Sequence, residues 1–246
     1  MDENKEPVFI SIVIPIYNEE NRIENFLSDV ISFLKKETFS YEIIIVDDGS
    51  TDSTVKITDS ILEKNVTGKY KLLTLSENMG KGGAVRKGML EAGGEYIFFI
   101  DADGSTSIEE VDKFITHFSP EFDIYIAIRT IKLKAPFKRK FLGYGYIFLA
   151  NIFLQMNVSD FTCGFKCYRY DIAQEIFSIQ TLNNWSFDAE DLYITKKYGY
   201  KVKEIPVLWK HVEGSKVKVF KNVIICGFDL FRIRYNDICG RYRWTH

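Results

Sequence analysis

The sequence predicts an α/β protein with a mostly parallel sheet and helices on both of its faces. Between residues 8 and 128, short and nearly continuous apolar runs alternate with segments whose apolar residues recur every three or four positions. The first pattern is typical of strands buried on both sides, and the second is typical of helices that pack on a sheet. Strands that alternate with helices in this way form parallel sheets.

Five strands and four helices are expected in this first half. The strands are predicted at residues 8–15, 41–46, 71–75, 95–100 and 122–128. Apolar spacing predicts the first helix over residues 23–34, and a second begins near Asp52, whose side chain favours a helix start. A third helix is expected over residues 82–92, because Gly93 and Gly94 follow it, and a fourth over residues 108–118.

The second half is less regular. It offers an aromatic stretch at 141–156, a short strand at 165–168, a helix at 188–198, a strand at 201–207 and an apolar segment at 223–231. We predict a single domain over residues 1–220. The remaining residues, 221–246, are predicted to form an apolar and basic C-terminal segment that contacts a membrane surface or an acceptor.

Composition excludes several classes of protein. With 246 residues, 46% of them hydrophobic, the chain can bury one good core and is not disordered. Its net charge of −2 gives no overall attraction to nucleic acid. The four cysteines form no C-x-x-C motif and the three histidines are scattered, which argues against zinc and favours a reducing, cytoplasmic setting.

No membrane-spanning segment and no signal peptide are expected. The longest apolar stretch, 141–156, would reach about 24 Å as a helix, less than the roughly 30 Å hydrocarbon core of a bilayer. The first seven residues are charged, and a strand begins directly after them.

Two carboxylates stand two residues apart where the fourth expected strand ends. They belong to Asp101 and Asp103, with Ala102 between them. Residues i and i+2 of a strand point the same way, so these carboxylates would project together and repel each other. A hard divalent cation, which prefers oxygen ligands and often bridges to phosphate, would relieve this repulsion. The alternative interpretation is a solvated, Asp-rich turn.

Polar residues follow the other strands and are expected to meet the Asp pair at one rim of the sheet. Just past the expected strand ends lie Tyr17, Asp47, Asp48 and Asn78. Lys81 and Arg86 offer positive charge for phosphate, although the run GKGG at 80–83 matches neither a P-loop nor a G-x-G-x-x-G motif. Together these groups suit a metal-bound nucleoside diphosphate.

Seven segments of the chain resemble a known family. The segments SIVIPIYNEE (11–20), VDDGSTDST (46–54), NMGKGG (78–83) and DADGST (101–106) are similar to the inverting family 2 glycosyltransferases, which have the Rossmann-like GT-A fold. The segments DFTCGFKCY (160–168), WSFDAE (185–190) and PVLWKHVEGSK (206–216) resemble the dolichyl-phosphate glucosyltransferase and dolichyl-phosphate mannose synthase branch. The resemblance covers about residues 8–220.

This resemblance implies the transfer of a sugar from a nucleotide sugar to a polyprenyl phosphate. By matching position, it implies a nucleoside site formed by Pro15, Tyr17, Glu19 and Asp48, with Asp47 close by. Asp101 and Asp103 would hold Mg²⁺ or Mn²⁺ on the diphosphate. Arg129 and Lys216 would bind phosphate. Some members carry a Gln two residues after the second Asp as a further metal ligand, where this chain has Ser105, a weaker ligand. The expected donor-binding set is completed by Asn78, Lys81 and Ala102.

The implied reaction inverts the anomeric centre, and its nucleophile is a phosphate monoester. Such a phosphate has a second pKa of about 6 and needs little help from a base at neutral pH. It needs positive charge that brings two anionic groups together, which is the role expected of Arg129 and Lys216. Asp188 and Glu190 stand where relatives that act on a hydroxyl carry a base. The alternative is that these two carboxylates cap a helix and orient the ligands.

Apolar segments beside basic residues indicate peripheral contact with an anionic membrane, on its cytoplasmic face. The stretch 141–156 follows a basic run at 132–140, and segment 223–231 is flanked by Lys218, Lys221, Arg232 and Arg234. Apolar surface next to cations suits such a membrane. An ordinary core with a charged rim is the alternative interpretation for each segment.

Several functions remain open on the sequence alone. We favour transfer of glucose from UDP-glucose, because CGFK at 163–166 and FD at 187–188 resemble the glucose type. GDP-mannose or UDP-GlcNAc as donor, and a saccharide as acceptor, are alternatives. A non-catalytic module that binds a nucleotide sugar or a lipid is a third hypothesis, against which the intact Asp pair argues.

Overall fold

The computed structural model describes residues 7–66, 68–133, 137–210 and 219–243. Its strands are Ile10–Ile16 (β1), Tyr41–Asp47 (β2), Lys69–Thr74 (β3), Tyr96–Ile100 (β4), Ile124–Leu133 (β5), Phe165–Arg169 (β6) and Val202–Lys210 (β7). Its helices are Ile23–Leu34 (α1), Thr54–Asn65 (α2), Lys81–Glu91 (α3), Glu110–Ile115 (α4), Phe137–Leu154 (α5), Tyr170–Ile179 (α6), Phe187–Tyr198 (α7) and Val219–Ile238 (α8).

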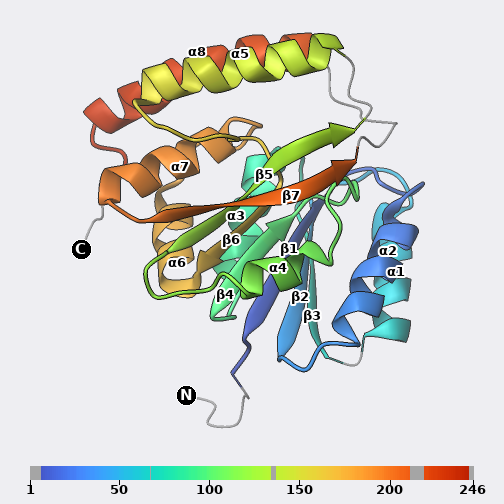
Figure 1. Ribbon diagram of the computed structural model, residues 1–246. Helices are drawn as coiled ribbons and strands as arrows, with labels where there is room; N and C mark the ends of the chain where they lie inside the picture. The colour runs from blue at the N-terminus through green and yellow to red at the C-terminus, as the bar shows by residue number, and fades with distance from the viewer. Residues whose placement is uncertain (1–6, 67, 134–136, 211–218, 244–246) are drawn as a thin grey trace.

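The strands form one seven-stranded sheet in the order β3-β2-β1-β4-β6-β5-β7 (Figure 1). The pairs β1–β2, β2–β3, β1–β4 and β5–β7 are parallel. Strand β6 runs antiparallel to both of its neighbours, β4 and β5. The ends of β1, β2 and β4 therefore open on the same rim of the sheet, since parallel strands end on the same side.

Alternating side chains of each strand divide the core between the two faces of the sheet. On β1, Ile12 and Ile14 point to the cluster covered by α1, α2 and α4, whereas Val13 points to the cluster covered by α3, α6 and α7. All three side chains are fully buried. Each such side chain contributes about 1.5–3 kcal/mol to folding, so burial on both faces explains why this strand reads as a continuous apolar run.

Helices α5 and α8 lie side by side along one end of the molecule (Figure 1). The rings of Phe153 on α5 and Phe231 on α8 meet edge to face, with centroids 4.6 Å apart. Leu230 and Ile233 of α8 are buried in the same cluster as Val13, so the helix is part of the common core. In the described ranges, no helix combines the length and the apolar character needed to cross a bilayer.

The α/β prediction is confirmed, and each predicted element has a counterpart within a few residues. The helix expected near residues 188–198 is α7, and the short strand expected at 165–168 is β6. Helix α6 was not expected. The domain boundary predicted at residue 220 falls inside α8, which begins at Val219.

Candidate active site

The loops after β1 and β2 are fastened to each other at the rim of the sheet. The backbone N–H of Asn18 donates to Ser50 Oγ at 2.8 Å, and the N–H of Thr51 donates to Asn18 Oδ1 at 2.8 Å. The N–H of Glu19 donates to Thr54 Oγ1 at 2.7 Å. Asn18 adopts a left-handed conformation (φ 53°), which turns the chain sharply after the strand. The Tyr17 side chain is left exposed on this rim.

The two acids at the end of β2, Asp47 and Asp48, are buried and bind backbone amides. Asp47 accepts a hydrogen bond from the N–H of Ser50 at 3.0 Å. Asp48 accepts from the N–H groups of Met79 at 2.7 Å and Gly80 at 2.9 Å, and so ties the end of β2 to the start of α3. Burial raises the pKa of Asp48, and the two backbone hydrogen bonds act in the opposite direction.

The remaining residues predicted for nucleoside binding lie around these loops. Pro15 is half-buried near the end of β1, and Asn78 is exposed just before α3. The Glu19 carboxylate is paired with the Arg22 guanidinium, whose Nη2 lies 2.6 Å from Oε1. The structure therefore brings the predicted residues to one rim, with Glu19 and Asp48 engaged by protein groups.

The Asp pair lies in a turn rather than on a strand. Strand β4 ends at Ile100, and the residues after Asp101 turn. The pair lies just past the strand, as expected, but the alternation of a strand does not govern how its two carboxylates project. Asp103 Oδ1 accepts from the N–H of Ser105 at 2.8 Å, while Ser105 and Ala102 are buried. This hydrogen bond within the turn fixes the Asp103 side chain. Short acidic side chains commonly accept such a bond from the backbone two residues further on.

Asp101 is covered by Lys81, the first residue of α3. The Lys81 Nζ lies 2.7 Å from Oδ1 and 2.9 Å from Oδ2 of Asp101. Burial acts to lower the pKa of Lys81, but attraction to Asp101, Asp188 and Asp103 outweighs it, so the pKa lies above its usual value. Lys81 is thus a charged ammonium at neutral pH. Arg86, the other residue suggested for phosphate, donates to the carbonyls of Phe177 and Ser178 at the end of α6, so two of its nitrogens are already engaged there.

The Asp pair fits a divalent cation that brings further ligands with it. Among the described residues, no three His, Cys, Asp or Glu side chains converge on one point. Magnesium is commonly held by one or two carboxylates, with phosphate oxygens and water in the remaining positions. Asp101, Asp103 and the Ser105 hydroxyl are hard oxygen donors of this kind. The donor set therefore suits a cation that arrives with a diphosphate.

Arg129, near the middle of β5, is held by Asp160. Its Nε and Nη2 donate to the two carboxylate oxygens of Asp160 at 2.6 and 2.7 Å, and Nη2 also donates to Thr162 at 2.7 Å. The guanidinium carbon lies 5.7 Å from the centroid of the Trp209 ring. Burial acts to lower the pKa of Arg129, but the hydrogen bonds and the negative charge of Asp160 outweigh this effect, so the pKa lies above its usual value. The guanidinium is thus fixed in a two-pronged ion pair.

The two acids at the start of α7 are buried, one in an ion pair and the other among hydrogen-bond donors. Asp188 forms an ion pair with Lys166, and both side chains are almost completely buried. Glu190 accepts hydrogen bonds from the N–H groups of Thr181 and Leu182, at 3.1 and 2.7 Å, and from the Tyr242 hydroxyl at 2.6 Å. Burial raises the pKa of Glu190, whereas these bonds lower it. Lys216, the second predicted phosphate ligand, lies outside the described residues.

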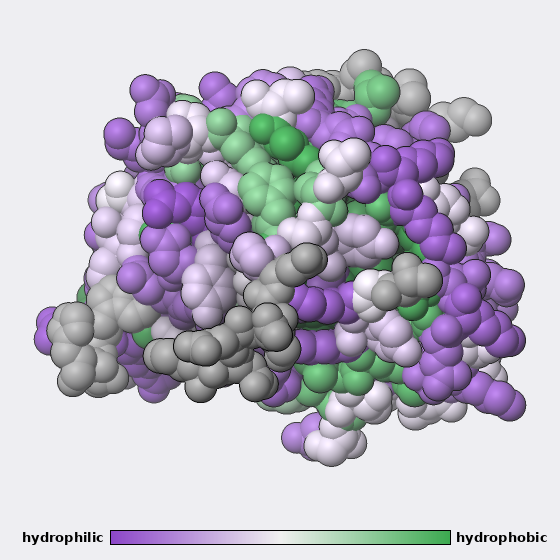
Figure 2. Space-filling view, turned by 90° about the horizontal axis from the view of Figure 1, so that it is seen from below, coloured by the Kyte–Doolittle hydropathy of each residue, from purple (hydrophilic) through white to green (hydrophobic). Residues whose placement is uncertain are grey.

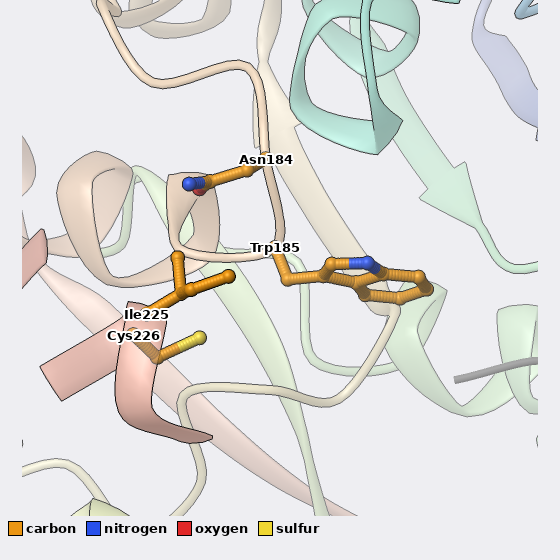
Figure 3. A pocket seen from close by; sticks show the side chains of 4 residues that line it. All are labelled: Asn184, Trp185, Ile225 and Cys226. Atoms are coloured by element: carbon orange, nitrogen blue, oxygen red, sulfur yellow. The ribbon is translucent and has the colours of Figure 1, made fainter. Parts of the chain in front are cut away.

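A small pocket opens between α8 and the loop before α7. It has a volume of about 100 Å³ and is lined by Asn184, Trp185, Ile225 and Cys226. Figure 3 shows the Trp185 ring extending away from the two α8 side chains. That ring lies over Lys81, with the ammonium 5.0 Å from its centroid. Trp185 therefore stands between an apolar pocket and the cation that covers Asp101.

A family model for glycosyl transferase family 2 matches residues 11–177 of the chain. The chain belongs to glycosyltransferase family 2. It is 35% identical over 259 residues to a dolichyl-phosphate beta-glucosyltransferase of Dictyostelium discoideum, covering 98% of this chain and 79% of that protein. It is 36% identical over 262 residues to the Saccharomyces cerevisiae protein of the same name, covering 98% and 78%.

Solved structures support the GT-A fold of this family 2 protein. Glucosyl-3-phosphoglycerate synthase of Mycobacterium tuberculosis, crystallised with Mn²⁺, UDP and glucosyl-3-phosphoglycerate, gives a TM-score of 0.66 at 17% identity, covering 95% of this chain and 80% of that chain. Mannosyl-3-phosphoglycerate synthase of Rubrobacter xylanophilus gives 0.68 at 15% identity, covering 97% and 77%. The predictions of the family, the GT-A fold and a glycosyltransferase are confirmed.

Three residues that shape the site in this glycosyltransferase were not predicted. Asp160 holds Arg129, and Lys166 holds Asp188. Both residues lie in the segment 160–168, which resembles the family but predicted no role for either of them. Gly164 lies so close to Asp101 that a Cβ at this position would collide with its carboxylate. Asp160 and Lys166 are charged residues inside the motif at 160–168. Charged residues within a motif that resembles a family are the signal that could have identified these two.

Proposed function

We propose that the protein transfers glucose from UDP-glucose to a dolichyl-type polyprenyl phosphate, with inversion at the anomeric carbon. The observation that carries this proposal is the identity of about 35%, over 98% of the chain, to dolichyl-phosphate beta-glucosyltransferases. The chemistry of the rim supports it, because acids and a lysine meet beyond the ends of β1, β2 and β4, where sheets of this kind bind ligands.

The donor diphosphate is assigned to the turn after β4. Asp101 and Asp103 would hold Mg²⁺ or Mn²⁺, with Ser105 or a water beside them. When bound, the cation stabilises negative charge on the departing nucleoside diphosphate, an effect worth several kcal/mol of barrier. Lys81 adds a positive charge to the same region. The nucleoside would lie along the loops after β1 and β2, against the exposed Tyr17 side chain. The residues assigned to that side are Pro15, Tyr17, Glu19, Asp47, Asp48, Asn78 and Ala102.

The acceptor phosphate attacks the anomeric carbon from the face opposite the diphosphate. It is largely ionised at neutral pH, so the reaction needs electrostatic compensation more than a base. Arg129, fixed by Asp160, would supply that positive charge together with Lys216. Both carboxylates are buried, with Asp188 in an ion pair and Glu190 in hydrogen bonds, which favours the interpretation that they orient the site. In this assignment neither carboxylate takes a proton from the acceptor.

We infer that α5 and α8 bring the protein to the membrane that contains the acceptor. Their outer faces expose large apolar side chains, which are Tyr144, Phe148, Leu149, Ile152, Ile225, Phe228, Phe231, Tyr235 and Ile238. Arg232, Arg241 and Arg243 are exposed nearby. Apolar side chains flanked by cations bind anionic lipid surfaces. The four free thiols suit the cytoplasmic face of such a membrane.

The test is a radiolabel transfer assay with dolichyl phosphate as acceptor. UDP-glucose, GDP-mannose and UDP-GlcNAc are compared in the presence of Mg²⁺ or Mn²⁺, and label in the organic phase is counted. We expect label from UDP-glucose, loss of at least about 100-fold with Asp103→Ala, and full activity with Asp59→Ala, an exposed acid on α2. Transfer from GDP-mannose alone would contradict the glucose assignment, and label only on a soluble saccharide would contradict the acceptor.

A further inference from the structure

Lys81 is held in a closed setting rather than on an open surface. Its side chain is only 11% exposed, although lysines usually keep their ammonium in water. The rings of Trp185, Phe187 and Phe99 lie 5.0, 5.7 and 5.8 Å from its Nζ. Aromatic faces at these distances attract a cation, so the surroundings hold the ammonium against Asp101.

The backbone at the start of α3 contributes to this position. Gly80 has φ 94°, and a Cβ there would lie 2.5 Å from the carbonyl oxygen of Asn183. The N–H of Gly83 donates to the same oxygen at 3.2 Å. The first turn of α3 is therefore pressed against the loop that carries Trp185. Lys81, as the first residue of that turn, reaches Asp101 from a fixed point.

Both oxygens of Asp101 are engaged by the same ammonium. Nζ lies within 2.9 Å of each of them. On another side the carboxylate packs against Gly164, where a Cβ would collide with it, and the N–H of Asp101 donates to the Gly164 carbonyl at 2.9 Å. A metal ion that binds Asp101 must therefore approach oxygens that Lys81 already neutralises, and the two cations repel each other.

We propose that Lys81 competes with the divalent cation for Asp101, so that the metal binds weakly alone and strongly together with the nucleoside diphosphate. The inference rests on the proposed function, since it needs a metal on Asp101. The diphosphate resolves the competition in two ways. Its oxygens complete the coordination of the metal, and they also accept the Lys81 ammonium, which a flexible four-carbon stem can carry the short distance. The lysine thereby couples the two ligands.

The experiment measures Mn²⁺ binding by electron paramagnetic resonance, with and without UDP, and requires no catalysis. Lys81→Met and Lys81→Gln remove the competing charge and are expected to bind Mn²⁺ alone about tenfold more tightly than the wild type. In both variants UDP should increase the affinity for Mn²⁺ less than it does in the wild type. Lys81→Arg keeps the charge and should retain weak binding of the metal alone.

Two controls locate the effect. Lys87→Met, on the same helix, removes an exposed lysine paired with Glu91 and should leave Mn²⁺ binding unchanged. The double variant Lys81→Met/Asp101→Asn should lose the gain in Mn²⁺ affinity, because the carboxylate for which the two cations compete is no longer present. Thermal unfolding of each variant confirms that it is folded.

The proposal is overturned if both neutral variants bind Mn²⁺ alone no more tightly than the wild type, or if UDP enhances their Mn²⁺ affinity as much. It is also overturned if the gain persists without the Asp101 carboxylate. Failure of the function proposed above has a different signature, in which Mn²⁺ and UDP binding remain coupled through Lys81 while no label reaches dolichyl phosphate.

Discussion

Asp191 is a buried acid of α7 without a hydrogen-bonding partner among the described protein groups. Both of its oxygens are inaccessible, and so is the unpaired hydroxyl of Tyr168. Burial raises its pKa well above the usual range, and the charges of Glu190 and Asp188 add to this effect while Lys166 opposes it. The folded protein therefore keeps a proton on Asp191 at pH values where the unfolded chain has lost it.

This residue makes stability depend on pH in a defined direction. The favourable contribution of the proton is complete below the ordinary pKa of an Asp, about 3.9, and is lost as the pH rises through the folded-state pKa. Asp191→Asn resembles the protonated acid at every pH. We expect the variant to gain stability relative to the wild type as the pH rises, reaching about 1–3 kcal/mol at neutral pH.

Urea unfolding at several pH values checks this expectation. Asp59→Asn, which changes an exposed acid, serves as the control and should follow the wild type. A difference between Asp191→Asn and wild type that is constant with pH would show that Asp191 is ionised in the folded protein.

Asp160 holds Arg129, the residue assigned above to the acceptor phosphate. The carboxylate is only 3% exposed and binds the guanidinium through both oxygens. Asp160→Asn removes the charge that fixes Arg129, and misplacement of a positioned group by about 1 Å can cost roughly 100-fold in rate. We expect transfer to fall by about 10- to 100-fold, with a raised KM for the polyprenyl phosphate.

Steady-state kinetics with varied acceptor and varied donor separate this role from a general loss of structure. Asp171→Asn is the matched control, because it removes an exposed carboxylate that pairs with Arg169. An unchanged acceptor KM in Asp160→Asn would remove Arg129 from the acceptor side of the site.

At the scale of elements, α3 lies closer to the sheet than its sequence suggests. A Cβ at Gly88 would collide with Val13 on β1, whereas Gly145 on α5 has no atom within 4 Å of such a Cβ. Alanine normally stabilises a helix interior by about 1 kcal/mol relative to glycine. At position 88 overpacking reverses this sign, and we expect Gly88→Ala to destabilise by about 1–3 kcal/mol.

Thermal unfolding of the two glycine variants provides the comparison. Gly145→Ala should be neutral or slightly stabilising because its site is open. Equal effects at the two positions would mean that α3 can move away from β1 without cost.

The elements that the sequence predicted well are those whose burial pattern repeats along the chain. Strands β1, β2 and β4 are buried on both faces, and their apolar runs carry that information directly. The partners of β6 could not be predicted in this way. It is buried like the others, but it is inserted in reverse between β4 and β5, and burial alone carries no direction.

The candidate site divides along the same line. The sequence places the Asp pair, Asp47 and Asp48 at strand ends, and the parallel sheet then brings them to one rim. It does not place Lys81 on Asp101, because that contact depends on the close approach of α3 to the loop before α7. Nor does it reveal that Glu190 is enclosed by Thr181, Leu182 and Tyr242.

At the scale of the molecule, apolar exposure is unevenly distributed. Of the large apolar side chains that are exposed in the described structure, four lie on α5 and five on α8. The view from below Figure 1, at the end away from these helices, shows hydrophilic side chains with several apolar patches among them (Figure 2). Patches of clustered apolar side chains commonly mark contact surfaces.

Helix α8 links that surface to the site. Its Asp229 accepts hydrogen bonds from Asn184 and Ser186 at 2.8 and 2.7 Å, and its Asn236 donates to Thr181 at 2.9 Å. The loop thus held carries Trp185, which lies over Lys81. Binding of α8 to a membrane surface would therefore also orient Trp185, which lies beside the proposed metal site.

Removal of apolar side chains from α8 should weaken membrane binding while leaving the fold intact. Phe228 and Ile238 are 72% and 80% exposed, so their loss removes little from the core. Full burial of each would contribute about 1.5–3 kcal/mol, and even partial insertion gives the pair on the order of tenfold in partitioning. We expect Phe228→Ser/Ile238→Ser to release the protein from vesicles that contain phosphatidylserine, as measured by co-sedimentation.

The control is Tyr170→Ser, which changes an exposed aromatic residue at the start of α6 and should bind as the wild type does. Equal binding of all three proteins would exclude the α8 surface as the membrane contact, while equal binding of the wild type to neutral and anionic vesicles would exclude the arginines beside it.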